Sequence, residues 1–219
     1  MNPMIVMVTD RHRSGDAARL IETVEYAASA GVDLIQVRER GLEDRDLFDM
    51  VRRIIAAAAS RARVLVNLRT DVALAAGASG VHLPGTAPPA SRVRTIVPPG
   101  FLIGRSVHDP DEARAAERDG GCDYLIFGTV FASAGKPAGH EVAGVDGLRA
   151  VCRAVRLPVI AIGGMDGARA REAAAAGAAG LAAIGMFVPT PADRAGDPAR
   201  AIAGRVAAAR AAFDAPPPV

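Results

Sequence analysis

The stretch LIGRSVHDPDEARAAERDGGCDYLIFGTVFASAGK, residues 102–136, predicts a strand, a helix, a second strand and a loop, in that order. The apolar run LIGRSV is typical of a buried parallel strand. Asp109 and Pro110 predict a helix that begins directly after His108, because Asp caps helices well and Pro suits their first position. Gly120 ends that helix before the next apolar run, DYLIFGTVF. The stretch is therefore one βαβ unit with polar residues at its strand ends.

The same alternation of apolar runs and amphipathic helices continues along the chain. Strands are expected at 4–9, 34–38, 64–67, 80–83, 102–107, 123–131, 159–162 and 180–183. Helices are expected at 14–30, 44–60, 71–76, 91–97, from 110, at 147–155, from 167 and at 199–213. Eight near-regular units favour a closed (β/α)8 barrel over an open doubly wound sheet. The prediction is a single α/β TIM-barrel domain, residues 1–213, followed by a Pro-rich tail at 214–219.

Composition excludes several classes of function. The net charge is +2, and two Tyr, six Phe and no Trp offer few stacking platforms for nucleic acid. No apolar run approaches the ~20 residues of a membrane span, and MNPMIVMVTD becomes polar too soon for a signal peptide. Cys122 and Cys152 lack metal-ligand spacing and are expected to be free thiols. We therefore expect a cytoplasmic protein without nucleic-acid or membrane partners.

Small residues follow the last two expected strands. Gly163 and Gly164 come after the seventh strand, and Ile184 and Gly185 come after the eighth. In (β/α)8 barrels the backbone N–H groups of these two loops often hold a phosphate, and glycine lets its oxygens approach closely. The matched positions predict a phosphate site, although these glycines could also serve only as tight turns.

The segment after the second strand carries alternating polar residues. Alternation places Gln36, Arg38 and Arg40 on one side of an extended segment. A guanidinium that points into a barrel needs an anionic partner. For Arg38 that partner is either a ligand anion or an internal carboxylate, Glu39 or Asp10.

Other polar residues lie at or near the carboxyl ends of strands, where barrels bind ligands. Asn67 ends the third strand and could hydrogen-bond a ligand. His82 is consistent both with a satisfied interior group and with a ligand contact. Ser106 ends the fifth strand, and Ser133 and Lys136, the only lysine, lie in a Gly-rich loop that could close over a bound anion. These residues are candidates for substrate binding.

His108 stands at a strand end, directly before a capped helix. Imidazole can give or take a proton near neutral pH, and an adjacent helix N-terminus disfavours its cation. We therefore predict His108 as the catalytic proton-transfer residue. No pair of carboxylates with metal-ligand spacing stands at these strand ends, so no metal site is predicted.

Five stretches together resemble the thiamine phosphate synthase/TenI superfamily. They are IQVRER (35–40), VNLRTDVALAAGASGVHLPG (66–85), IGRSVHDPDEA (103–113), DYLIFGTVFASAGK (123–136) and PVIAIGGM (158–165). They occur in order and with compatible spacing. The resemblance implies a (β/α)8 barrel and an enzyme of thiamine biosynthesis.

One branch of this superfamily, the synthases, joins a pyrimidine pyrophosphate to a thiazole phosphate with Mg²⁺ held by two Asp residues. Its pyrophosphate motif corresponds here to residues 36–40, and its T-x-T-K loop reads SAGK at 133–136. Leu68 and Ala87 stand at the two metal positions. A departing diphosphate concentrates negative charge that Mg²⁺ would neutralise, so the loss of both carboxylates argues against synthase activity.

The other branch, the TenI-type thiazole tautomerases, lacks that metal site. It resembles this chain most at IGRSVH, where His108 matches the expected proton-transfer residue. The reaction aromatises a carboxythiazole phosphate by moving a proton from a ring carbon to an exocyclic carbon, which needs one group of tunable pKa and a phosphate anchor. The resemblance thus implies a tautomerase without a cofactor.

The same resemblance implies how the substrate, a phosphorylated thiazole, would be held. Gly164, Ile184 and Gly185 would bind its phosphate, and Arg38 or Lys136 would meet its carboxylate. Two alternatives stay open, namely a synthase that requires Mg²⁺ and a non-catalytic barrel that binds thiazole phosphate as a regulator. The short helices at 71–76 and 91–97 could expose apolar surface for a homodimer.

Overall fold

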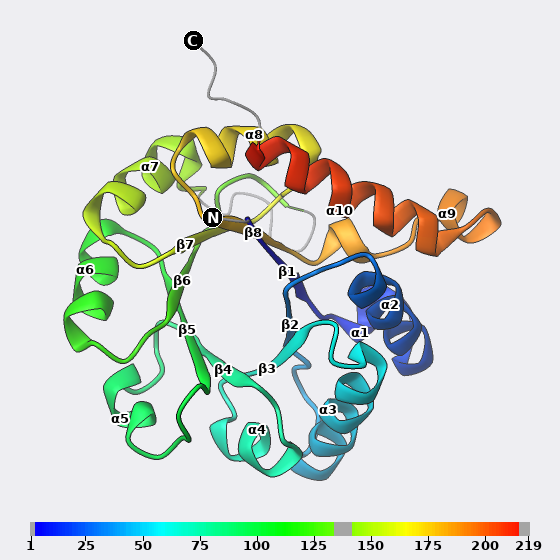
Figure 1. The fold of residues 1–219 in the computed structure, drawn as a ribbon, viewed down its shortest axis with the longest axis horizontal. Coiled ribbons are helices and arrows are strands. Elements are labelled where there is room, and N and C mark those ends of the chain that lie inside the picture. Colours follow the sequence, from blue (N-terminus) through cyan, green and yellow to red (C-terminus); the bar gives the residue numbers. More distant parts are fainter. Residues whose placement is uncertain (1–2, 134–141, 215–219) are drawn as a thin grey trace.

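A computed structural model describes residues 3–133 and 142–214 of the chain. Eight parallel strands pair in sequence order and close into a barrel, and the helices form a ring around it (Figure 1). The first half contains β1 (Met4–Val8), α1 (Arg11–Ser14), α2 (Ala17–Ser29), β2 (Leu34–Val37), α3 (Asp44–Ala58), β3 (Arg63–Asn67), α4 (Thr70–Ala76), β4 (Gly80–Leu83) and α5 (Ala90–Arg94). The second half contains β5 (Leu102–Val107), α6 (Pro110–Asp119), β6 (Tyr124–Phe127), α7 (Gly144–Ala154), β7 (Val159–Ile162), α8 (Gly167–Ala175), β8 (Gly180–Ala183), the 3-10 turn η1 (Gly185–Phe187), α9 (Pro191–Ala195) and α10 (Pro198–Asp214). The predicted TIM barrel is confirmed.

Helix boundaries follow local capping chemistry. The α6 helix begins at Pro110 as predicted, because the Asp109 carboxylate accepts hydrogen bonds of 2.8 Å from the N–H groups of Asp111 and Glu112. The helix expected at 14–30 begins instead at 17, where Asp16 caps α2. The short helices α1 and α9 were not predicted, because a single turn is too short to show helical periodicity.

The strands bury side chains on both faces. Inside the barrel, Val6, Val8, Leu34, Leu65, Tyr124, Ile126, Ile160 and Ala182 form a compact cluster. A larger apolar layer lies between the outer faces of the strands and the surrounding helices. This two-sided burial explains why the strands read as continuous apolar runs. It also leaves the strand ends as the place for polar groups.

The remaining expectations concern the surface and the thiols. Both cysteines are free and half-buried, and burial raises the pKa of each thiol to about 11. Leu74 in α4 and Ile96 after α5 are exposed, by 39% and 67%, and the homodimer stays a prediction. Within the described ranges, no helix combines the length and apolar character needed to cross a bilayer. The helix α10 reaches Asp214, and residues 215–219 lie outside the described part.

Candidate active site at the barrel mouth

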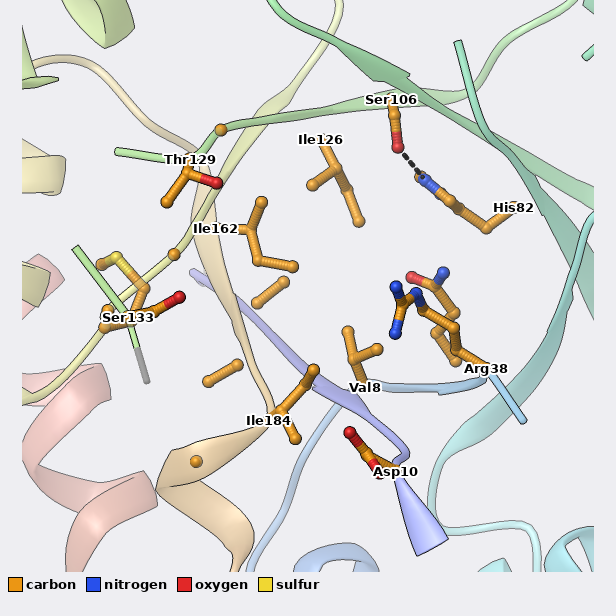
Figure 2. Close-up of a pocket in the computed structure, with 18 of the residues that line it drawn as sticks. Val8, Asp10, Arg38, His82, Ser106, Ile126, Thr129, Ser133, Ile162 and Ile184 are labelled. Atoms are coloured by element: carbon orange, nitrogen blue, oxygen red, sulfur yellow. Dashed lines mark hydrogen bonds between the residues drawn. The ribbon is translucent and has the colours of Figure 1, made fainter. Parts of the chain in front are cut away.

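A cavity of about 880 Å³ opens at the carboxyl ends of the strands. Every strand contributes to its lining through Val8, Gln36, Asn67, His82, Ser106, Ile126, Ile162 or Ala182. Figure 2 shows Val8, Ile126 and Ile162 presenting apolar side chains into this space. Polar groups surround them, with Arg38 on one side and Ser133 on the other. The mouth therefore combines an apolar interior with polar groups around it, as small-molecule sites usually do.

Twelve of the thirteen predicted site residues line this one cavity. They are Gln36, Arg38, Arg40, Asn67, His82, Ser106, His108, Ser133, Gly163, Gly164, Ile184 and Gly185. The thirteenth, Lys136, lies outside the described residues. The parallel barrel explains this gathering, since all strand ends meet at one rim. The individual roles of these residues stay predictions.

His108 lies at the rim of the cavity and is held by Glu112. Oε2 of Glu112 is 3.0 Å from Nδ1 of His108 and also accepts the His108 backbone N–H at 2.8 Å. A carboxylate accepts only, so Nδ1 carries the proton in this contact and Nε2 is left to exchange one. Glu112 was not predicted as a site residue. The sequence signal that could have pointed to Glu112 is its position three residues after the Asp109 cap, in the first turn of the helix next to His108.

Arg38 lies half-buried in the mouth. Burial lowers the pKa of its guanidinium, and the nearby Arg40 lowers it further. Among the described residues Arg38 forms no ion pair, so the internal partner considered for it is not found. Its neighbour Glu39 is buried and accepts hydrogen bonds from Thr9 Oγ1 at 2.5 Å and from the backbone N–H of Arg11 at 3.1 Å.

An ion pair between Arg38 and Glu39, one of the alternatives that the sequence left open, is therefore not found among the described residues, and the reason is local. Adjacent residues of an extended segment point to opposite sides. Glu39 consequently faces Arg11, with which it forms a salt bridge of 3.4 Å. The other carboxylate considered, Asp10, caps α1 by accepting from the N–H of Arg13 at 3.2 Å. Arg38 remains a cation available to a ligand anion.

Two amide side chains that line the cavity are hydrogen-bonded to each other. Nε2 of Gln36 donates to Oδ1 of Asn67 at 3.0 Å, which joins β2 to β3. Gln36 is buried and Asn67 is half-buried. The Asn67 amide N–H₂ is left to donate, because its oxygen already accepts from Gln36. The pair offers fixed polar groups to a ligand.

The two loops predicted to hold phosphate face the cavity together. Gly164 has φ +61°, and a Cβ there would lie 2.5 Å from the carbonyl oxygen of Ala132, so the turn requires glycine. Within the described part of the chain, the N–H groups of Gly164 and Gly185 meet no hydrogen-bond acceptor. Free N–H groups at adjacent barrel loops suit a phosphate.

Two arginines that were not predicted flank these loops. Nη2 of Arg13 lies 3.1 Å from the place where a Gly185 Cβ would be. Nη1 of Arg169 donates to the Gly164 carbonyl at 2.6 Å, and its guanidinium lies 5.1 Å from the centre of the Phe131 ring. Both arginines line the cavity. Nothing in the sequence distinguishes them from the many arginines on solvated helix faces.

His82 is both an interior group and part of the cavity wall. It is 2% exposed, and Nε2 lies 2.8 Å from Oγ of Ser106, as the dashed line in Figure 2 marks. Burial lowers the pKa of His82 to about 3, so the ring is neutral at physiological pH. A neutral imidazole cannot bind an anion by charge. It can orient the Ser106 hydroxyl.

The residues at the expected Mg²⁺ positions do not suit the ion. Leu68 is 45% exposed and Ala87 is half-buried, and neither side chain has an oxygen. The carboxylates that line the cavity follow three different strands, with Asp10 and Asp166 in loops and Glu112 in the first turn of α6, and each already accepts hydrogen bonds. No group of three ligand-type side chains gathers in the described ranges. Mg²⁺ needs several oxygens in near-octahedral geometry.

Fold and site together define a (β/α)8 enzyme whose mouth is equipped for a small anionic substrate. The chain belongs to the thiamine monophosphate synthase family (TMP-TENI), whose model matches residues 5–187. It is 41% identical over 199 residues to a thiamine-phosphate synthase of Methanoculleus marisnigri, covering 90% of this chain and 89% of that protein. It is 37% identical over 186 residues to one of Coprothermobacter proteolyticus, covering 84% and 86%.

Solved structures agree with this family. A thiamine phosphate pyrophosphorylase from Pyrococcus furiosus superposes with a TM-score of 0.75 at 32% identity and covers 93% of this chain and 96% of that one. A 3-hexulose-6-phosphate synthase superposes with a TM-score of 0.70 at 18% identity, covering 97% of this chain and 100% of that one. The second likeness concerns the fold alone. The comparisons confirm the superfamily and do not separate its TenI-type branch.

Proposed function

We propose that this chain is a thiazole tautomerase, which aromatises a carboxythiazole phosphate by proton transfer through His108. The observation that carries the proposal is the contact of 3.0 Å between Nδ1 of His108 and Oε2 of Glu112 at the rim of the cavity. It leaves Nε2 as the nitrogen that exchanges a proton with the substrate. The mouth offers no pair of neighbouring free carboxylates within the described residues, as binding of Mg²⁺ at a diphosphate would require.

The proposed reaction is an isomerisation. Nε2 of His108 takes a proton from the ring carbon, and the Glu112 carboxylate stabilises the imidazolium that forms. The ring double bonds shift, and Nε2 returns a proton to the exocyclic carbon, so the atomic composition is unchanged. Such general acid–base catalysis contributes roughly 10²–10⁴-fold in rate.

The substrate's two anionic groups suit different sides of the mouth. The free N–H groups of Gly164 and Gly185, with Arg13 beside them, suit the phosphate. Arg38 has no ion pair with a described residue and suits the carboxylate. The apolar walls limit the water that competes for these contacts.

A second candidate is a thiamine-phosphate synthase, and the relatives' names favour it over the tautomerase. One relative with that name is 41% identical to this chain. In a synthase, Arg38 would bind the pyrophosphate group of the pyrimidine substrate, and the Gly164 loop would bind thiazole phosphate. The unsuitable groups at the two metal positions count against this candidate.

Two assays separate these functions. The purified protein is given the carboxythiazole phosphate tautomer alone, and separately hydroxymethylpyrimidine pyrophosphate with thiazole phosphate and Mg²⁺. We expect rapid aromatisation in the first assay and no robust formation of thiamine phosphate in the second. Robust thiamine phosphate formation would reject the tautomerase. Tight binding of thiazole phosphate without turnover in either assay would instead indicate a regulator.

A further inference from the structure

Three residues on neighbouring strands form one level inside the barrel. The strand register pairs His82 on β4 with Gly104 on β5, and Gly104 with Tyr124 on β6. A Cβ on Gly104 would lie 2.2 Å from Cζ of Tyr124 and 2.4 Å from its hydroxyl oxygen. The phenol therefore lies across Gly104, toward His82, where only glycine leaves room. The two ring centres are 6.0 Å apart.

Two polar atoms at this level lack partners. Nδ1 of His82 and the hydroxyl oxygen of Tyr124 are buried and form no hydrogen bond with any described residue. A buried polar atom without a partner costs about 1–3 kcal/mol, and ordered water commonly satisfies such atoms. Burial lowers the pKa of His82 and raises that of Tyr124, so both groups are neutral near pH 7. The ring then carries a single N–H and the phenol carries its O–H.

We propose that a buried water molecule joins the Tyr124 hydroxyl to Nδ1 of His82. The resulting series of hydrogen bonds makes Ser106 a hydrogen-bond donor to the substrate. The phenol O–H donates to the water, and the water donates to Nδ1. The ring proton is then on Nε2 and donates to Oγ of Ser106 across 2.8 Å. The Ser106 O–H remains for an acceptor in the cavity, which Ser106 lines.

The opposite direction leaves more groups unsatisfied. If Nδ1 carried the proton, the ring N–H and the phenol O–H would both donate to the water, and the water's own two hydrogens would lose the acceptor that Nδ1 provides in the first direction. Nε2 would then accept from Ser106, whose hydroxyl could offer only its oxygen to the cavity. A substrate with two anionic groups presents acceptors, so the first direction also suits the mouth better. Tyr124 and His82 are positioning residues in this scheme.

This inference deepens the proposed function, because Ser106 belongs to the same mouth, yet its test needs no turnover. The histidines are labelled with ¹⁵N, and the signal of His82 is assigned in a variant with His12, His108 and His140 all replaced by Gln. In the wild type at pH 7 we expect Nε2 protonated and Nδ1 unprotonated and hydrogen-bonded. A wild-type ring protonated on Nδ1 would overturn the inference without bearing on His108.

Variants test the chain of bonds itself. Tyr124→Phe should shift the ring toward the Nδ1–H form and weaken binding of thiazole phosphate about fivefold, the usual size of one hydrogen bond. Ser106→Ala should weaken binding similarly and leave the Nε2–H form in place. Tyr26→Phe is the matched control, because Tyr26 bonds to Glu22 on the surface, and it should change neither readout. A His82 signal unchanged by Tyr124→Phe would contradict the inference.

Discussion

Oε2 of Glu112 lies 3.0 Å from Nδ1 of His108, which precedes Glu112 by four residues. This contact connects the end of β5 to the first turn of α6. The contact holds one nitrogen of the imidazole and leaves the other without a partner among the described residues. A carboxylate in this place can also stabilise a transient imidazolium. The pair is therefore the first place to test the proposed chemistry.

Replacing Glu112 by Gln should lower kcat for aromatisation about tenfold and leave KM nearly unchanged, because the imidazolium loses its charged partner while the substrate loses no contact. Steady-state kinetics measure both constants. Asp111→Asn is the matched control, since Asp111 is a neighbouring exposed acid whose carboxylate pairs with Arg114. Equal losses in the two variants would show a general effect of charge in α6 and contradict the assignment.

Replacing Arg13 by Gln should weaken binding of thiazole phosphate by roughly tenfold, since a charged hydrogen bond contributes about 1.5–3 kcal/mol. The dephosphorylated thiazole alcohol should bind both proteins equally. Titration calorimetry gives the four affinities. Arg171→Gln serves as the control, because Arg171 is exposed on α8 and does not line the cavity. An Arg13 variant that binds the phosphate normally would exclude this residue from the site.

The ionisation of Asp193 should make the stability of the fold depend on pH in the acidic range. Arg205, at 2.5 Å, and the backbone N–H of Thr190 lower the pKa of Asp193 to about 2. A lowered carboxyl pKa stabilises the fold above the unfolded value of about 4, and that stability is lost as the pH falls toward 2. Asp193→Asn should therefore lower Tm at pH 7, and the difference should shrink between pH 4 and pH 2. A difference independent of pH would contradict this reading.

Gly104→Ala should destabilise the barrel by about 1–3 kcal/mol, because the added Cβ overlaps the Tyr124 ring. Gly204→Ala provides the contrast. Gly204 lies in α10, nothing lies within 4 Å of an added Cβ, and alanine favours a helix by about 1 kcal/mol. Urea unfolding should therefore show opposite signs for the two changes. A stabilising Gly104→Ala would show that Tyr124 does not fill that space.

Much of the architecture could be predicted because it depends on local signals. The apolar runs, the Asp109 cap and the glycines after helices each act within a few residues, and eight repeats of them define a closed barrel. Residues at strand ends could be assigned to the mouth for the same reason. Short turns such as α1 could not be predicted, since a single turn shows no periodicity.

Contacts between loops could not be read from the sequence. Arg13 reaches Gly185 from the other end of the chain, and no spacing rule links two residues so far apart. The bond between His82 and Ser106 likewise depends on the register of β4 and β5. The choice among the partners left open for Arg38 is different, because alternation along the segment already places Glu39 on the opposite side.

Aromatisation in D₂O tests the central claim most directly. The wild-type protein should convert the carboxythiazole phosphate tautomer into product that carries deuterium on the exocyclic carbon, and His108→Asn should slow this by roughly 10²–10⁴-fold without weakening substrate binding. NMR of the product gives the position of the deuterium and the rate together. A His108→Asn protein that aromatises the substrate at the wild-type rate would contradict the account.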